Sequence, residues 1–110
     1  MPYDPIYHEE EPTRDELSQF VGPTLLEFGA NWCGICSSFA PTLEQLLGEY
    51  PDVRHIKVED ARGKPLGRSF RVKLWPTLVF LRDGHVIGQV ARPSREESRA
   101  GLDAITNRSA

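Results

Sequence analysis

The sequence predicts a single α/β domain with a mixed β-sheet of four strands and helices on both faces. Apolar, strand-like runs at 24–30 and 53–59 are separated by a long helical pattern. The two strands should therefore be parallel and joined by a right-handed crossover. Two further runs, 77–81 and 86–90, flank an Asp-Gly pair at 83–84, which is a strong signal for an antiparallel hairpin. A parallel pair and a hairpin in one sheet make it mixed.

The first twelve residues differ from the rest in composition. They contain three prolines and an acidic run at 9–11. We therefore expect residues 1–12 to form a flexible acidic arm and residues 13–110 to form the domain. Ile6 and Tyr7 could add a fifth strand at a sheet edge, but the prolines on either side disfavour this pairing.

Four helices are expected between and around these strands. Capping boxes at 13–16 and 94–97 pair a hydroxyl residue with a glutamate three positions later, which predicts helix starts at both places. A long helix should run from Cys33 to about Glu49, and a short one should follow Pro65. The apolar positions that follow the helical period, and are expected to be buried, are Leu17, Phe20, Val21, Phe39, Leu43, Leu46, Leu47, Tyr50, Leu66, Phe70, Leu102 and Ile105.

Composition argues against several classes of function. The formal net charge of −3 gives no basic footprint for nucleic acid. No apolar run approaches the length that spans a membrane. The N-terminal sequence lacks the basic start and apolar stretch of a signal peptide, so we expect a cytoplasmic protein. Nothing in the pattern demands more than a monomer, and no cofactor is expected.

The chemistry is expected at Cys33 and Cys36, the only two cysteines. Three residues apart on a helix, they lie one turn apart on the same face, so their thiols can close or open a disulfide. The pair opens a helix, whose N-terminus has free N–H groups and a partial positive charge. Cys33, the outer thiol, is therefore the expected nucleophile. Cys36, one turn further in, is the expected resolving thiol.

A buried carboxylate could serve these thiols. In the strand at 24–30, alternation places Leu25, Glu27 and Gly29 on one face, and Leu26, Phe28 and Ala30 on the other. A carboxylate in an apolar setting can accept a proton near neutral pH. Glu27 is the carboxylate set among the apolar residues of this strand.

From about residue 14 to residue 107, the chain resembles the thioredoxin family. The features that carry the resemblance occur in the expected order: a Trp-Cys-Gly-x-Cys motif after an apolar strand, Pro41 within the next helix, Pro76-Thr77 at the start of the third strand, an Asp-Gly hairpin and a C-terminal helix. The resemblance implies a thioredoxin fold with a central mixed sheet of four or five strands. It also implies a protein-disulfide reductase that acts on disulfide-containing proteins, with a thioredoxin reductase as electron donor.

The resemblance assigns roles to particular residues as well. Pro76 would follow a cis peptide bond and lie beside the thiols. Glu27 would be the buried acid beneath Cys36 and the acceptor of its proton, and Lys57 would be the neighbour that tunes Glu27. The implied substrate-binding positions are Trp32, Gly34, Ile35, Trp75, Pro76, Ala91 and Arg92.

The sequence departs from the family's pattern in four places. Ile35 replaces a usual proline and restores a backbone N–H near Cys33, so we expect a weaker reductant than an ordinary thioredoxin. Trp75 stands where an aliphatic residue is common and should restrict the set of partners. Gly29 replaces a common aromatic residue. Ala91-Arg92 replaces a small-residue turn and adds a positive charge that favours acidic partners. These changes weigh against efficient recycling by a standard thioredoxin reductase.

Three alternatives remain. One is a thioredoxin-fold binding or chaperone module with weak or specialised redox activity. Another is a zinc site completed by His8, His55 or His85, but a second close-spaced pair of ligands is missing. We expect these histidines to be surface residues. The third is a glutaredoxin-like enzyme, which the Trp before the first cysteine and the Gly after it disfavour.

Overall fold

A computed structural model describes residues 3–106 of the chain. In these residues the strands form one mixed sheet in the order β2-β1-β3-β4. β1 pairs in parallel with β2 and antiparallel with β3, and β3 and β4 form the antiparallel hairpin. The bounds of the strands are β1 Pro23–Gly29, β2 Arg54–Glu59, β3 Thr77–Arg82 and β4 His85–Ala91. The expected mixed α/β fold is confirmed.

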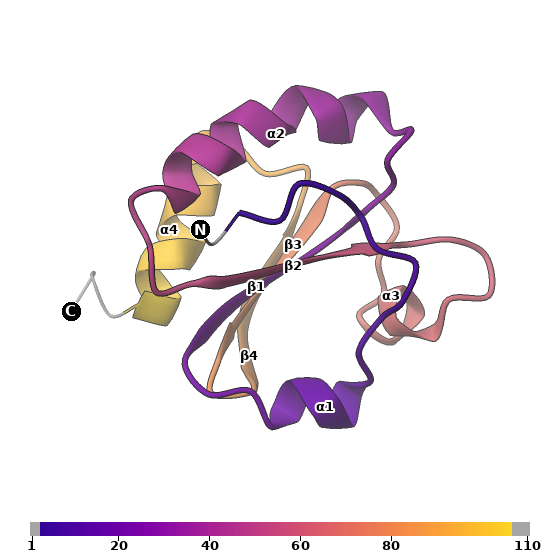
Figure 1. The fold of residues 1–110 in the computed structure, drawn as a ribbon, viewed down its shortest axis with the longest axis horizontal. Coiled ribbons are helices and arrows are strands. Elements are labelled where there is room, and N and C mark those ends of the chain that lie inside the picture. Colours follow the sequence, from indigo (N-terminus) through magenta and orange to yellow (C-terminus); the bar gives the residue numbers. More distant parts are fainter. Residues whose placement is uncertain (1–2, 107–110) are drawn as a thin grey trace.

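Helices cover both faces of this sheet. Figure 1 shows α2 and α4 on one side of the sheet, and α1 and α3 on the other. The bounds of the helices are α1 Arg14–Ser18, α2 Gly34–Leu47, α3 Pro65–Ser69 and α4 Arg95–Thr106. None of these helices is long and apolar enough to cross a membrane.

The sheet separates two hydrophobic clusters, and β1 contributes to both. Leu25 is fully buried against α2 and α4, whereas Leu26 and Phe28 are fully buried on the side of α1 and α3. This is the alternation that the sequence predicts. Burying one such side chain stabilises a fold by about 1.5–3 kcal/mol, so both faces of β1 anchor the strand firmly. Glu27, between these residues, is held in a fixed position beneath α2.

Both predicted capping boxes form. The Thr13 hydroxyl accepts the backbone N–H of Glu16 at 3.0 Å, and the Glu16 carboxylate accepts that of Thr13 at 2.9 Å. Ser94 and Glu97 make the same reciprocal pair before α4, at 3.0 and 2.9 Å. These signals are local, which is why the sequence alone locates both helix starts.

One buried position was predicted wrongly. α1 ends at Ser18, so Val21 lies in the loop that leads to β1 and is 82% exposed. The turn between β3 and β4 is as predicted: Asp83 and Gly84 have φ values of 51° and 81°, the left-handed pair of a type I′ hairpin. A Cβ on Gly84 would lie 2.2 Å from the carbonyl oxygen of Ser18, so this turn packs directly against α1.

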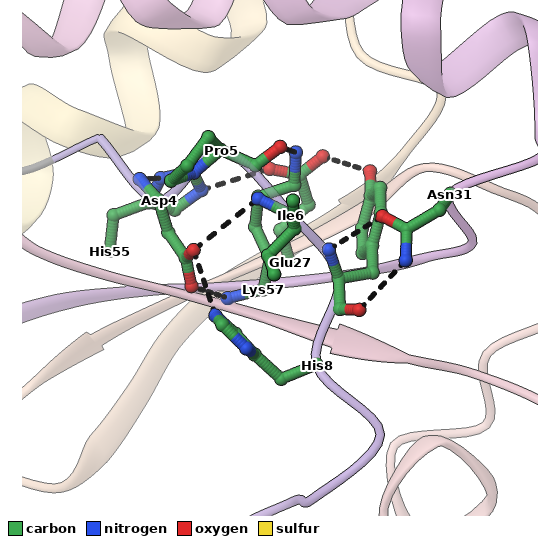
Figure 2. A network of polar contacts seen from close by, with 9 residues as sticks. Asp4, Pro5, Ile6, His8, Glu27, Asn31, His55 and Lys57 are labelled. Atoms are coloured by element: carbon green, nitrogen blue, oxygen red, sulfur yellow. Dashed lines mark hydrogen bonds and ion pairs between the residues drawn. The ribbon is translucent and has the colours of Figure 1, made fainter.

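Residues 3–12 do not lie apart from the domain as the expected arm would. Tyr7 is only 5% exposed, and His8 forms a parallel bridge with Val58 at the edge of β2. The Asn31 side chain binds both backbone groups of Tyr7: its Oδ1 accepts the N–H at 2.8 Å, and its Nδ2 donates to the carbonyl oxygen at 3.0 Å (Figure 2). The prolines limit strand pairing to one bridge, but they do not prevent burial of the Tyr7 ring. Residues 1–2 of the expected arm and 107–110 of the expected domain lie outside the described residues.

Candidate active site

The two cysteines lie at the start of α2 as free thiols. Cys33 is the N-cap residue, and its Sγ accepts a hydrogen bond from the Cys36 backbone N–H at 3.2 Å. Such an N–H and the positive end of the helix both stabilise a thiolate. The donor is Cys36 and not Ile35, the residue whose N–H is expected from the sequence to stabilise the thiolate. Cys33 is partly exposed and Cys36 is buried, so an incoming disulfide can reach Cys33 first.

Cys36 is held in its protonated form. Burial raises the pKa of the Cys36 thiol to about 11, and the neighbouring Cys33 sulfur contributes to the rise. The Ala30 backbone and the Tyr7 hydroxyl act in the opposite direction, to a smaller extent. At neutral pH, Cys36 therefore needs a proton acceptor before it can react as a thiolate.

Glu27 is a buried acceptor with a separate donor on each oxygen. It is 2% exposed, and the Tyr7 hydroxyl donates to its Oε2. His55 Nε2 lies 2.9 Å from its Oε1 (Figure 2). Because His55 Nδ1 accepts the backbone N–H of Asp4 at 2.8 Å, the proton of a neutral ring lies on Nε2 and is donated to Glu27.

Lys57 faces Glu27 in the β1–β2 register but contacts other groups. Its Nζ donates to the Pro5 carbonyl oxygen at 3.4 Å and lies 4.2 Å from the centroid of the Tyr7 ring. Among residues 3–106, no ion pair joins Lys57 to Glu27. The groups that hydrogen-bond the carboxylate are Tyr7 and His55, so any influence of Lys57 on Glu27 acts without an ion pair.

Tyr7 and His55 were missed by sequence reasoning. His55, expected at the surface, is only 7% exposed because its ring lies against Glu27 and its Nδ1 binds the N-terminal segment. Tyr7 lies 20 residues before Glu27, in the segment expected to be an arm. The one signal that could have found Tyr7 is Gly29, where the family commonly has an aromatic residue.

The loop before β3 brings Trp75 against Trp32, the residue before Cys33, and Pro76 follows Trp75 in this loop. Their peptide bond is cis, the geometry that the resemblance implied. The indole of Trp75 packs edge-on against Trp32, with ring centroids 5.3 Å apart, and its Nε1 donates to Asp60 Oδ2 at 2.8 Å. Trp75 is thereby held from two sides, by an aromatic ring and by a carboxylate.

Arg92, which follows β4, is hydrogen-bonded to the backbone of this loop. It has a left-handed backbone with φ of 47°, donates its N–H to the Pro76 carbonyl oxygen at 2.7 Å, and donates its Nε to the Trp75 carbonyl oxygen at 3.0 Å. Ala91 lies opposite Thr77 in the β3–β4 register. The structure therefore brings both expected residues next to the loop of Trp75 and Pro76.

Exposed apolar side chains flank the reactive thiol. Trp32 is 76% exposed and Ile35 is 46% exposed. Between them in the chain, Gly34 has open space where a Cβ would project. A partner that approaches Cys33 would thus meet an apolar surface with little steric obstruction.

Two of the three histidines, His8 and His55, bind groups other than the thiols. His55 uses both ring nitrogens, for Asp4 and Glu27, and His8 Nε2 lies 2.9 Å from Asp4 Oδ1. Within residues 3–106, no group of three or more His, Cys, Asp or Glu side chains is arranged to hold a metal ion. The described part of the chain thus offers no support for the zinc alternative.

The mixed sheet, the helices on its two faces and the thiol pair at the start of α2 define an α/β protein with a dithiol site. The family model described as Thioredoxin matches residues 5–104. The chain belongs to the thioredoxin family.

Similar proteins include both solved structures and sequence relatives. The reduced form of thioredoxin 2 from Pseudomonas aeruginosa PAO1 superimposes with a TM-score of 0.84 and 47% identity, over 96% of this chain and 99% of that one. Thioredoxin H2-1 of Oryza sativa is 27% identical over 85 residues, which are 77% of this chain and 62% of that protein. Mitochondrial Thioredoxin-3 of Saccharomyces cerevisiae is 35% identical over 66 residues, which are 60% of this chain and 52% of that protein. The chain thus spans less than two thirds of the length of these two sequence relatives.

Proposed function

We propose that this protein reduces disulfide bonds of protein substrates through a Cys33–Cys36 dithiol/disulfide couple. The observation that carries the proposal is the asymmetry of the two thiols. One is partly exposed at a helix N-cap and accepts an N–H, and the other is buried one turn further in. This arrangement separates an attacking thiolate from a resolving thiol.

The first step is attack by the Cys33 thiolate on one sulfur of the substrate disulfide. The S–S bond of the substrate breaks, a mixed disulfide forms with Cys33, and the other substrate sulfur leaves as a thiolate. The apolar side chains of Trp32 and Ile35, together with the loop of Trp75, Pro76, Ala91 and Arg92, are proposed to bind the substrate segment.

The second step releases the reduced substrate. Cys36 gives its proton to Glu27 and attacks the sulfur of Cys33. A Cys33–Cys36 disulfide forms, and the second substrate sulfur leaves as a thiolate. Two electrons have then passed from the protein to the substrate, so an external reductant must restore the dithiol. We propose that a thioredoxin reductase is this donor, and that the protein acts as a cytoplasmic monomer.

The test is equilibration in glutathione redox buffers, with the tryptophan fluorescence near the thiols as the signal. We expect a reversible two-electron transition in the native protein and none in Cys36→Ser. A potential above about −270 mV, the value of thioredoxin, agrees with the weaker-reductant hypothesis, and one at or below it contradicts that hypothesis. If the native protein shows no reversible transition, the binding-module alternative replaces the redox function.

A second assay separates these two functions in another way. A Cys33→Ser, Cys36→Ser double variant should lose all reduction of protein disulfides. Retention of the biological activity by this variant would favour a thioredoxin-fold binding or chaperone module.

A further inference from the structure

The ring of Tyr7 occupies the space above Gly29. A Cβ built on Gly29 would lie 2.5 Å from Tyr7 Cζ and 2.7 Å from the Tyr7 hydroxyl oxygen. The N-terminal segment thus supplies an aromatic ring where the family commonly has one at position 29 itself. The supplied ring differs in one respect that matters chemically: it has a hydroxyl group.

That hydroxyl lies between the resolving thiol and the buried acid. It donates to Glu27 Oε2, and the same hydroxyl lowers the pKa of the Cys36 thiol, which burial raises. Tyr7 and Cys36 line the same small cavity of about 90 Å³. Within residues 3–106, no hydrogen bond joins the Cys36 thiol directly to Glu27. His55 is bonded to Oε1, so the group on the other oxygen of the carboxylate is the Tyr7 hydroxyl, and Tyr7 also borders the cavity that Cys36 lines.

We propose that Tyr7 is a catalytic residue that relays the Cys36 proton to Glu27 during resolution of the mixed disulfide. The S–H bond of Cys36 breaks as an O–H bond forms on the Tyr7 oxygen. The original O–H bond of Tyr7 breaks as one forms on Glu27 Oε2. Tyr7 is a neutral phenol before and after the transfer, and Cys36 becomes the thiolate that attacks Cys33. The relay rests on the proposed function and specifies how its second step loses a proton.

The surroundings of Tyr7 favour a concerted transfer. Burial, and then the charge of Glu27, raise the pKa of the Tyr7 hydroxyl, so a free phenolate is disfavoured. Lys57 lies near this path, with its Nζ 4.2 Å from the Tyr7 ring centroid, and Cys33 adjoins its start at Cys36. Around Glu27 lie His55, its partner Asp4, and Tyr3, whose ring centroid is 5.2 Å from that of His55. The Asn31 amide holds the Tyr7 backbone, which keeps the ring next to Glu27 and beside the cavity that Cys36 lines.

The test uses Tyr7→Phe, which keeps the ring over Gly29 and removes only the hydroxyl. An aromatic disulfide that releases one coloured thiolate at each chemical step separates attack by Cys33 from resolution by Cys36 in a stopped-flow experiment. We expect an unchanged first phase and a second phase slowed about tenfold or more at pH 7, since general acid–base catalysis typically contributes ~10²–10⁴-fold. The difference between the second-phase rates of Tyr7→Phe and the unaltered protein should become smaller as the pH rises, because Cys36 then ionises without a proton acceptor in the protein.

The matched control is Tyr50→Phe. Tyr50 is another buried tyrosine whose hydroxyl donates to a carboxylate, that of Asp103, but it follows the opposite end of α2. Both phases of Tyr50→Phe should match the unaltered protein. A second phase of Tyr7→Phe that equals that of the unaltered protein at pH 7, or is slowed by the same factor at every pH, would overturn the relay.

Two further measurements keep the inference testable if Tyr7→Phe folds poorly or gives a small effect. If Tyr7 and Glu27 act in one relay, the double variant Tyr7→Phe, Glu27→Gln should have the same second-phase rate as Glu27→Gln alone. A double variant slowed by the product of the two single effects would contradict the relay. In mixtures of light and heavy water, the unaltered protein should show a curved dependence of the second phase on deuterium content, because two protons move. A linear dependence would overturn the relay. Failure of the unaltered protein to form the Cys33–Cys36 disulfide would instead overturn the proposed function itself.

Discussion

The indole N–H of Trp75 donates to Asp60 Oδ2 at 2.8 Å, which ties the residue before Pro76 to the end of β2. Asp60 is in turn held to β1, because its backbone N–H donates to the Gly29 carbonyl oxygen at 2.8 Å. The side chain expected to restrict the substrate groove is therefore fixed by the sheet itself.

Releasing Trp75 should broaden the range of substrates. Asp60→Ala removes the partner of the indole N–H, and Trp75→Ile removes the indole. We expect both variants to change the relative rates at which a panel of protein disulfides is reduced. Asp60→Ala should also lower the free energy of unfolding by about 1.5–3 kcal/mol, the usual range for a hydrogen bond to a charged group. Asp52→Ala, at an exposed turn, is the control. Unchanged relative rates in Trp75→Ile would show that the indole does not select substrates.

Gly29 should be sensitive to substitution only when Tyr7 is present. Gly29→Ala places a Cβ 2.5 Å from Tyr7 Cζ, so it should lower the free energy of unfolding by about 1–3 kcal/mol, as overpacking does. In a Tyr7→Ala background the same change should cost far less. Gly34→Ala, where a Cβ meets open space, is the matched control. Urea unfolding of the unaltered protein, Gly29→Ala, Tyr7→Ala and the double variant measures the coupling free energy between the two positions. Additive effects on the free energy of unfolding would show that Tyr7 does not occupy this space in solution.

The stability of the reduced protein should fall in alkaline solution in a way that depends on Cys36. Burial raises the pKa of this thiol from its ordinary value of 9.0 to about 11, so the folded protein binds the proton more tightly than the unfolded chain does. The resulting stabilisation is complete below about pH 9 and is lost as the pH rises toward 11. Urea unfolding at pH 8 and pH 10.5 should show that the free energy of unfolding falls more between these pH values in the unaltered protein than in Cys36→Ala. Equal losses would mean that the thiol is not shielded in the folded state.

Arg92 combines an unfavourable backbone conformation with a useful side chain. A left-handed φ of 47° costs a residue other than glycine roughly 1–2 kcal/mol, whereas the Nε bond to the Trp75 carbonyl oxygen offsets part of that cost. We expect Arg92→Ala to be about 1 kcal/mol less stable than the unaltered protein, because it keeps the strain and loses the bond. Arg92→Gly should be close to the unaltered protein in thermal unfolding. A variant order with glycine below alanine would contradict this account.

The parts of the fold that the sequence predicts well are those set by near neighbours. Thr13 and Glu16 cap a helix within one turn, and the two-residue period of β1 decides on which face Glu27 lies. Asp83 and Gly84 specify a turn through their own backbone preferences. Each of these signals can be read within four or five residues, because the interactions that produce it are that short in sequence.

The surroundings of Glu27 were not predictable in the same way. The hydrogen bonds that hold it come from residues 20 and 28 positions away, and His55 is fixed by a backbone N–H another 51 positions distant. The N-terminal segment has the composition of an arm, and no local pattern shows that Tyr7 fills the space left by Gly29. The absence of a side chain at Gly29 and the ring of Tyr7 are related only in the folded protein, where the ring packs over the glycine.

The two hydrogen bonds between the Asn31 amide and the Tyr7 backbone have a practical consequence for the preparation of this protein. The hydroxyl over the buried acid belongs to the segment before β1 and not to the helix of the cysteines, so proteolytic trimming before His8 would remove it. Preparations with a shortened or tagged leading segment should therefore be compared by their rate of Cys36 alkylation before their reductase activities are compared. A change in the leading segment would therefore impair the proposed proton relay even though both cysteines are intact.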